Sequence, residues 1–427
     1  MKVLFITFFF PPYNTIGSVR TGNTAKILHD MGIDIKVIAG KEEDLNKDLP
    51  IKIPTDYIYY EKYFDIHKFF LKLLRKDVKE IKKVTHSGIN DNFKTKIYKK
   101  ISTLYKYIFF TPDRYIGWYP YAYRRAEDII KVWKPDIIYA SAMPFTSLLL
   151  GSRLSKKYGI PFVAELRDLW IDNHYSKHNL LSKYLEKYAL NQASAIITVS
   201  EPLAERLKER YRKPIHVIKN AFDEEEFINL IQNKRNQVEG KKLIITYTGS
   251  LYAGKQDPSL LFKIISKNED LKNKVICKFY GDNLEWLNIL AKEFDIVENV
   301  QVHPKVSRAE ALKIQAESDI LLLLTWNDPR ELGVYTGKLF EYIGNAKPIL
   351  AIGNKENVAS QLINNYGFGI AENDPVKLKE FILNCDKKDF LQIINENYKK
   401  YRYLFERKHE VAKLIKIFEN VLSGMEK

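Results

Sequence analysis

Short apolar runs alternate with helical stretches along the whole chain, and this alternation constrains the fold more than any other feature of the sequence. Strands separated by helices predict a parallel sheet, because each helix returns the chain to start the next strand in the same direction. The runs form two groups, which predicts two doubly wound α/β domains. The predicted strands are Val3 to Phe9, Asp34 to Ala39, Ile137 to Ala140, Phe162 to Glu165, Ala195 to Val199 and His216 to Ile218 in the first group, and Leu243 to Thr248, Val275 to Tyr280, Val300 to His303, Asp319 to Leu324 and Pro348 to Ile352 in the second.

The domain boundaries follow from this grouping. The 427 residues suffice for two complete cores, because single domains rarely grow beyond about 250 residues. Between the groups the sequence is polar and charged, so we place a linker at 223–242, between an N-terminal domain at 1–222 and a C-terminal domain at 243–394. Apolar residues at helical spacing predict C-terminal helices over 395–427, one of which is expected to return to the first domain.

The net charge of +15 predicts an anionic partner: nucleic acid, an acidic membrane surface or a phosphorylated substrate. The positive charge is concentrated in a basic amphipathic excursion at 62–110, where thirteen Lys and Arg stand against four Asp and Glu between Lys62 and Lys106, with aromatic residues interleaved. Such a segment suits a helix lying in an anionic headgroup layer, or a solvated helix whose aromatic residues pack on the domain. Nucleic acid is not expected as a partner, because no recognition-module signature accompanies the charge.

Several site classes lose their usual support. Cys277 and Cys385 provide no disulfide framework and indicate a reducing compartment, and the eight histidines show no metal-ligand spacing. No dinucleotide-binding or P-loop glycine motif is present. The apolar amino terminus breaks at Pro11 and Pro12, before it could span a bilayer, so it predicts a buried first strand and not a signal peptide. We therefore expect no metal and a cytoplasmic location.

A strand, loop and helix carrying Lys338 and Glu341 lie between Ile320 and Pro348. A helix that begins at a glycine presents free N–H groups and a partial positive charge, which favour a phosphate or diphosphate. Glu341, one turn into the helix, could then bind ribose hydroxyls. An ordinary strand-to-helix connection in an α/β domain explains the same residues.

A second glycine-bearing loop follows the strand that ends at Thr248. Gly249 and Gly254 allow the loop to fold tightly, and Lys255 supplies a compact positive charge for a phosphate. We expect this loop to face the one at Gly333 across the same sheet edge. Together the two loops predict a diphosphate site.

The N-terminal half carries two further clusters after predicted strands. Gly17 and Ser18 precede an apolar helix that Ser18 could cap, with Arg20 in its first turn. The strand that ends near Glu165 continues to Arg167 and Asp168, which are expected to point into a cleft. Asp168 is the best-placed carboxylate for polarising an acceptor hydroxyl, although a structural pair with Arg167 explains the same residues.

An ordered set of motifs spans nearly the whole chain and resembles a family-4 retaining glycosyltransferase of the GT-B fold, of the bacterial surface-polysaccharide (O-antigen or capsule) kind. This fold consists of two Rossmann-like domains that face a central cleft. The motifs are Phe9 to Pro12 with Gly17, Glu165 to Trp170, Ala195 to Pro202, Val217 to Asp223, Tyr247 to Ser250, Tyr280 to Asp282, Val302 to Arg308, Lys338 to Tyr342, and Lys347 with Pro348.

The resemblance implies that the second domain binds a nucleotide-sugar donor, usually a uridine diphosphate sugar, and that the first domain holds the acceptor. Retention in this fold is described as front-face displacement, in which the leaving diphosphate accepts the acceptor's proton and no protein nucleophile or metal cofactor is required. Asp168, Lys255 and Glu341 are the expected catalytic residues. The donor site is expected to comprise Gly249, Ser250, Lys255, His303, Lys305, Val306, Thr336, Gly337, Lys338 and Glu341, and the acceptor side Gly17, Ser18, Arg20, Glu165 and Arg167.

Three positions depart from the family's pattern. Gly333 stands where a second Glu is common, Ser250 where many members carry Arg, and Ala221 where Gly is usual. These changes resemble a subgroup acting on amino or deoxy sugars. We expect transfer of a hexosyl or N-acetylhexosaminyl group to a lipid-linked or glycan acceptor, by an enzyme attached peripherally to the inner face of the plasma membrane. An inactive membrane-docked scaffold and a non-hydrolysing nucleotide-sugar epimerase are the alternatives.

Overall fold

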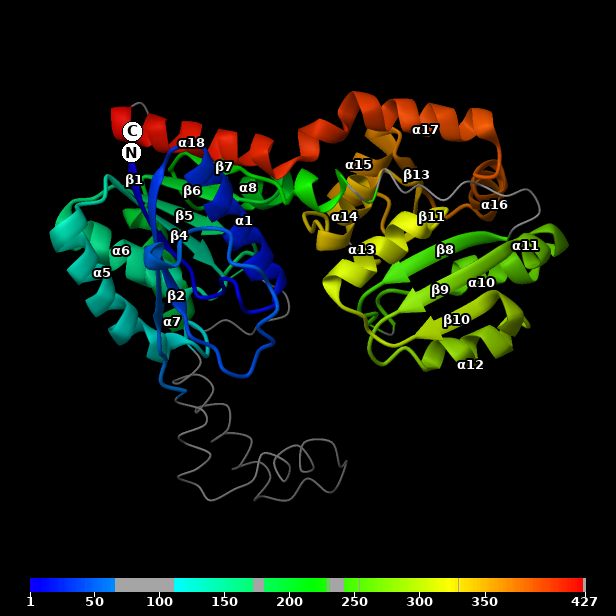
Figure 1. Cartoon of the computed structure of the whole chain (residues 1–427), viewed down its shortest axis with the longest axis horizontal. Helices are drawn as coiled ribbons and strands as arrows, with labels where there is room; N and C mark the ends of the chain where they lie inside the picture. Colours follow the sequence, from blue (N-terminus) through cyan, green and yellow to red (C-terminus); the bar gives the residue numbers. More distant parts are fainter. Residues whose placement is uncertain are drawn as a thin grey trace, which may run out of the picture. The chain divides into compact units, whose positions relative to one another are not determined.

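The computed structural model describes residues 1–65, 111–171, 180–228, 230, 242–252, 254–328 and 330–424. The chain divides into two compact units. Unit 1 comprises Met1–Ile218 with Val411–Lys427, and unit 2 comprises Lys219–Glu410. Figure 1 shows a parallel sheet with covering helices in each of them. Most of the basic excursion predicted at 62–110 lies outside the described residues.

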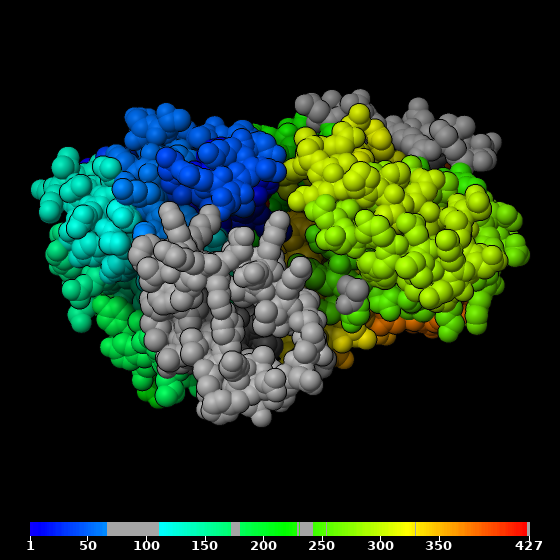
Figure 2. Space-filling model, turned by 90° about the horizontal axis from the view of Figure 1, so that it is seen from below, coloured from blue at the N-terminus to red at the C-terminus, as the bar shows by residue number. Residues whose placement is uncertain are grey.

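Within the described part of unit 1, seven parallel strands form one sheet in the order β3-β2-β1-β4-β5-β6-β7. The edge strand β3 was not predicted from the sequence. Helix α5 packs beside it, and Figure 2 shows the first part of the chain (blue) beside α5 (cyan). The strands are β1 (Lys2–Ile6), β2 (Asp34–Gly40), β3 (Ile58–Glu61), β4 (Ile137–Ala142), β5 (Phe162–Leu166), β6 (Ala195–Thr198) and β7 (Ile215–Val217). The helices are α1 (Ile16–Asp30), η1 (Thr55–Tyr57), η2 (Ile116–Trp118), α5 (Tyr119–Trp133), α6 (Thr146–Tyr158), α7 (Leu180–Gln192) and α8 (Glu201–Lys208).

The apolar residues of unit 1 form one core on each face of the sheet. Successive side chains of a strand point to opposite faces, so Val3 and Phe5 of β1 enter one core while Leu4 and Ile6 enter the other. The first core is closed by α1 and by the C-terminal helix α18 (Arg407–Ser423), and the second by α5, α6, α7 and α8. Near-continuous apolar strands are therefore explained by burial on both faces.

Within the described part of unit 2, six parallel strands form a sheet in the order β10-β9-β8-β11-β12-β13. Its strands are β8 (Leu243–Thr248), β9 (Val275–Tyr280), β10 (Val300–His303), β11 (Ile320–Leu324), β12 (Ile349–Ile352) and β13 (Gly369–Ala371), of which β13 was not predicted. Its helices are η3 (Glu224–Glu226), α10 (Ser259–Ser266), α11 (Glu269–Lys274), α12 (Trp286–Glu293), η4 (Val297–Asn299), α13 (Arg308–Glu317), α14 (Gly337–Asn345), α15 (Val358–Tyr366), α16 (Pro375–Asn384), α17 (Lys388–Tyr401) and η5 (Arg402–Phe405).

The chain passes between the units at two points, after Ile218 and after Glu410. The first crossing comes before the linker predicted at 223–242. Phe227 is fully buried in the core of unit 2, where a Cβ at Gly344 would lie 2.6 Å from its ring, so the start of the predicted linker packs in that unit. After the second crossing α18 packs on unit 1, and Figure 1 shows this helix in red along it. No helix among the described residues is both long enough and apolar enough to cross a membrane.

Candidate functional site

The expected site residues follow the carboxyl ends of the parallel strands, and the order of the strands indicates where a ligand binds along those ends. In unit 2, the order runs outward from β8 in both directions, through β9 on one side and through β11 on the other. In unit 1 the same reversal occurs at β1, between β2 and β4. Ligands of open α/β sheets bind at the carboxyl ends of the strands beside such a reversal, because the connecting helices leave on opposite faces there.

Gly249 follows β8 directly and lets two neighbouring loops approach each other. Its φ is +116°, and its N–H donates to the carbonyl oxygen of Tyr280 at the end of β9, 2.7 Å away. A Cβ at Gly281 would lie 2.3 Å from the carbonyl oxygen of Gly249, and one at Gly249 would lie 2.6 Å from Cε of Lys338. Gly281 therefore leaves room for the backbone of the β8 loop, and Gly249 leaves room for the Lys338 side chain.

The amino terminus of α14 presents hydrogen-bond donors at this edge. Thr336 precedes the helix, and its side chain makes no capping bond. The backbone N–H groups of Gly337 and Lys338 have no hydrogen-bond partner among the described residues, as expected for the first turn of a helix. The buried Oγ1 of Thr336 also lacks a partner in the described part of the chain.

Lys338 adds positive charge to this helix terminus. Its Nζ lies 5.1 Å from the centroid of the Tyr247 ring. Burial lowers the pKa of Lys338, and the carboxylate of Glu341 opposes that shift. A partly desolvated ammonium beside unpaired amides is suited to a phosphate, whose charge would compensate the lysine.

Glu341 is held by two side chains of α13. Its Oε1 accepts from Nη1 of Arg308 at 2.5 Å, and its Oε2 accepts from Nε2 of Gln315 at 3.2 Å. Gln315 is fully buried and also donates to Oγ1 of Thr248 at 2.8 Å, which ties the network to the end of β8. Sequence reasoning assigned no role to Arg308 or Gln315.

Lys255 lies on the loop after β8, and its neighbourhood joins that loop to the end of β11. Nζ of Lys255 is 4.3 Å from the centroid of the Trp326 ring, a cation–π distance. Nε2 of Gln256 donates to the carbonyl oxygen of Leu324 at 3.0 Å. The exposed Ser250 contributes its carbonyl oxygen, which accepts from the hydroxyl of Tyr247 at 2.9 Å.

The end of β10 carries the residues expected to border a base. The ring of His303 stacks on that of Tyr280 with centroids 4.5 Å apart and planes 14° apart. Burial, followed by the nearby Lys278, lowers the pKa of His303, which favours the neutral imidazole. Lys305 is exposed, and its Nζ lies 3.7 Å from Oδ2 of Asp282. The next residue, Val306, is partly buried.

In unit 1, Arg20 and Glu165 form a buried ion pair. Oε1 of Glu165 accepts from Nε of Arg20 at 3.2 Å and from Nη2 at 2.5 Å, and Oε2 accepts from the hydroxyl of Ser141 at 2.5 Å. Burial acts to raise the pKa of Glu165, but Arg20 and Arg167 outweigh it and hold the pKa below its usual value. Glu165 is 1% exposed, so its carboxylate is engaged within the protein.

The remaining acceptor-side residues lie as follows. The prediction that Ser18 caps α1 is wrong: the helix begins at Ile16, Oγ1 of Thr15 accepts from the N–H of Ser18, and Ser18 is fully buried in the first turn. Arg20, expected in that turn, comes one turn later because the helix starts earlier. A Cβ at Gly17 would lie 3.1 Å from Nη1 of Arg167.

Arg167 and Asp168 form no direct ion pair in the described part of the chain, although each charge acts on the pKa of the other residue. Arg167 donates to the carbonyl oxygens of Ala142 and Met143, at 2.6 and 3.1 Å, and no ion pair joins it to Asp168 in the described part of the chain. Asp168 is exposed after the end of β5. Burial raises the pKa of the Asp168 carboxyl group above its usual value, and the charge of Arg167 opposes that shift.

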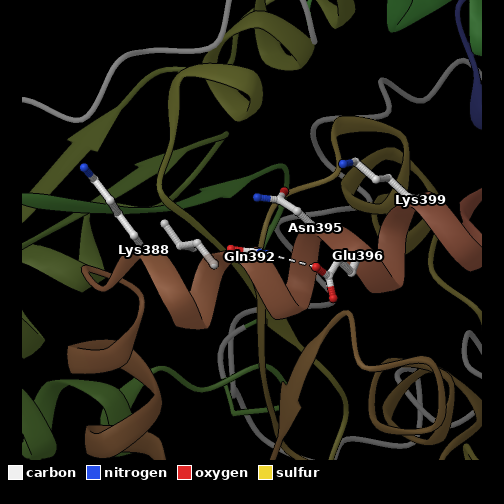
Figure 3. A pocket seen from close by; sticks show the side chains of 6 residues that line it. Lys388, Gln392, Asn395, Glu396 and Lys399 are labelled. Carbon is white, nitrogen blue, oxygen red and sulfur yellow. Dashed lines mark hydrogen bonds between the residues drawn. The ribbon is translucent and has the colours of Figure 1, made fainter.

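Two other features are distinct from these clusters. A hollow of about 370 Å³ lies along α17, and this one helix supplies its lining residues, among them Lys388, Gln392 and Lys399, as Figure 3 shows. Its dashed line is the hydrogen bond from Gln392 to Glu396, 3.0 Å long. Among the described residues, no group of three or more His, Cys, Asp or Glu could hold a metal ion.

The sequence matches a protein-family model, Glycosyltransferase Family 4, over residues 92–226. No curated protein matches the sequence. Among solved structures, sucrose-phosphate synthase from Thermosynechococcus elongatus is similar with a TM-score of 0.65 and 10% identity, over 99% of this chain and 100% of that chain. Anabaena Alr3699/HepE in complex with UDP has a TM-score of 0.61 and 15% identity, over 98% and 100%. WaaG, a glycosyltransferase involved in lipopolysaccharide biosynthesis, has a TM-score of 0.56 and 13% identity, over 97% and 99%.

These likenesses extend over almost the full length of both chains in each comparison. Two parallel-sheet α/β units with glycosyltransferase neighbours fit the GT-B fold, which confirms the predicted fold class. The fold and the family-4 match over part of the chain together support a glycosyltransferase.

Proposed function

We propose that this protein transfers a sugar from a nucleotide diphosphate sugar, most simply a uridine diphosphate sugar, with retention at the anomeric carbon. The observation that carries the proposal is the amino terminus of α14. There, two backbone N–H groups and the Thr336 hydroxyl without partners among the described residues gather with the ammonium of Lys338 beside Gly249. These groups suit a diphosphate. The likeness to Anabaena HepE, solved in complex with UDP, supports the choice of nucleotide.

The proposed donor roles follow the positions of the side chains. The amides after Thr336 bind the diphosphate, with Lys338 beside them and Lys255 approaching from the β8 loop. Glu341 accepts from ribose hydroxyls one turn into α14. The other proposed donor contacts are Gly249 and Ser250 near the diphosphate, and His303, Lys305 and Val306 at the border of the base.

In the proposed reaction, the anomeric carbon loses its bond to the diphosphate and gains one to the acceptor oxygen on the same face of the sugar. The acceptor's proton passes to the leaving diphosphate. Lys255, Lys338 and the α14 amides stabilise the negative charge that develops on the leaving group, an electrostatic role that needs no protein nucleophile. Asp168 is the carboxylate we propose to assist at the acceptor hydroxyl.

We propose a lipid-linked or glycan acceptor of surface-polysaccharide synthesis, used at the inner face of the plasma membrane. The basic, aromatic composition of 62–110 supports contact with anionic lipid. The likeness to WaaG, a glycosyltransferase involved in lipopolysaccharide biosynthesis, supports the same class of pathway. On this proposal Gly17, Arg167 and Asp168 lie on the acceptor side.

Thermal shift against uridine, guanosine and adenosine diphosphates and their sugar conjugates tests the donor class, because a ligand stabilises the state that binds it. We expect uridine diphosphate to raise the melting temperature. Lys255→Ala and Glu341→Ala should each weaken its binding by about 1.5 to 3 kcal/mol, the value of a charge-assisted hydrogen bond.

Lys274→Ala is the matched control, because it removes one positive charge just before the opposite, amino end of β9. Its affinity should equal that of the wild type. Wild-type affinity for uridine diphosphate in both Lys255→Ala and Glu341→Ala would contradict the assignment of the donor site. No shift with any nucleotide would favour the scaffold, and turnover of a nucleotide sugar without acceptor would favour the epimerase.

A further inference from the structure

Arg308 lies between two carboxylates in unit 2. As the first residue of α13, it donates from Nη1 to Oε1 of Glu341 at 2.5 Å and from Nη2 to Oε2 of Glu226 at 2.9 Å. Its side chain is 26% exposed, and those of the two glutamates are 22% and 21% exposed. Partial burial reduces solvent screening, so the guanidinium fixes the direction in which the Glu341 carboxylate faces.

The hydrogen-bond capacity of Glu341 is half used in this arrangement. A carboxylate offers about four lone-pair sites, two on each oxygen. Arg308 takes one site on Oε1 and Gln315 takes one on Oε2. Within the described residues about two acceptor sites therefore remain, one on each oxygen, which is the number that two vicinal hydroxyl groups require.

We propose that Arg308 is a positioning residue that orients Glu341 toward the ribose hydroxyls and thereby makes the site prefer ribonucleotides to deoxyribonucleotides. This inference rests on the proposed function, in which Glu341 binds the ribose. Arg308 itself need not touch the donor.

The neighbouring arginines show what a purely structural role looks like here. Three arginines from three elements bind the acidic run at 223–226: Arg407 pairs with Asp223 at 3.2 Å, Arg402 with Glu224 at 2.6 Å, and Arg308 with Glu226 at 2.9 Å. Of these ion pairs, only the Arg308 set extends to Glu341 within the described residues. Anchoring the acidic run and orienting Glu341 are therefore separable by mutation.

Isothermal titration calorimetry of the full chain with uridine diphosphate and its 2′-deoxy and 3′-deoxy analogues tests the proposal. In the wild type, loss of a hydroxyl that binds Glu341 should weaken binding about tenfold or more for at least one analogue. Arg308→Gln removes the positive charge beside Glu341. The ratio of the affinity for uridine diphosphate to the affinity for that deoxy analogue should therefore fall to about one. Arg308→Lys, with a single ammonium in place of the planar fork, should give a reduced ratio.

Glu226→Gln is the matched control, because it disturbs the other partner of Arg308 and leaves the bond to Glu341 in place. Its ratio should equal that of the wild type. A wild-type ratio in Arg308→Gln, or in Arg308→Lys if the first variant does not fold, would overturn the positioning role while leaving the proposed function intact. An equal collapse in Glu226→Gln would also overturn it, since the effect would then come from the packing around η3.

Two outcomes in the wild type distinguish a failure of the role of Arg308 from a failure of the proposed function. Uridine diphosphate binding without discrimination against either analogue would overturn the ribose contact and with it the role of Arg308. Failure of the wild type to bind any of uridine, guanosine or adenosine diphosphate would overturn the proposed function itself, and the inference would fall with it.

Discussion

Glu165 and Arg20 stabilise unit 1 from a position where sequence reasoning expected contact with an acceptor. Glu165→Ala would leave the Arg20 guanidinium buried without its counter-charge, and Arg20 is 6% exposed. Removing one partner of a buried pair costs about 3 to 5 kcal/mol, because the remaining charge is desolvated and unpaired. Urea denaturation should show this loss at pH 7.

The matched control removes both charges together. Arg20→Met with Glu165→Leu replaces the pair by apolar side chains and should be less destabilising than Glu165→Ala alone. Because the folded-state pKa of Glu165 is held below its usual value, the stabilisation from ionised Glu165 is present above that value and lost as the pH falls through the folded pKa. A Glu165→Ala variant as stable as the wild type would show that the pair contributes nothing.

Individual residues of the donor site also differ in how far the sequence can reveal them. Lys338 and Glu341 are identifiable because a glycine-led helix follows an apolar strand. The partners of Glu341 are 33 and 26 residues away and depend on how α13 packs against α14, which no local pattern encodes. One signal was available: Arg308 and Gln315 are seven residues apart and so share a helix face.

At the scale of elements, the loop after β8 depends on a glycine for its approach to α14. Gly249→Ala would force a side chain into a φ of +116° and place its Cβ 2.6 Å from Cε of Lys338. We expect a loss of about 1 to 3 kcal/mol from backbone strain, together with weaker uridine diphosphate binding because Lys338 must move. Thermal denaturation and calorimetry measure the two effects separately.

Gly254→Ala is the control within the same loop. Its φ is +76°, but beyond its two chain neighbours no atom of the described residues lies within 4 Å of the added Cβ. It should therefore lower stability through backbone strain and leave nucleotide affinity unchanged. Equal losses of affinity in the two variants would mean that the loop acts through its flexibility and not through its contact with Lys338.

The elements missed by sequence reasoning share one physical property. Both β3 and β13 are edge strands, of four and three residues, and β13 begins with glycine. Short edge strands are paired on one side and buried less completely, so their apolar pattern is weaker than that of the central strands, although the edge strands β7 and β10 were predicted. By contrast, strands such as β8 and β11 are predictable because both faces are covered.

At the scale of the whole molecule, the C-terminal segment returns to unit 1 after completing unit 2. Its helical spacing predicted helices, one of which was expected to return to the first domain, and Val411, Leu414 and Phe418 are buried in the core beside β1 and β4. The position of the first crossing was less predictable. Phe227 follows an acidic run that appears linker-like in sequence, and only the packing around Gly344 shows that it belongs to unit 2.

Phe418→Ala tests whether this return stabilises unit 1 specifically. Phe418 is fully buried, and its ring lies 5.5 Å from that of Tyr139 in β4. A cavity of this kind costs about 3 to 5 kcal/mol, which hydrogen exchange should report as lost protection in β1 and β4 but not in β8 and β11. Phe405→Ala, at a buried position in the core of unit 2, should give the reverse pattern. If either variant lowers protection equally in both sheets, the two units unfold as one cooperative block, and α18 then couples their stabilities instead of serving unit 1 alone.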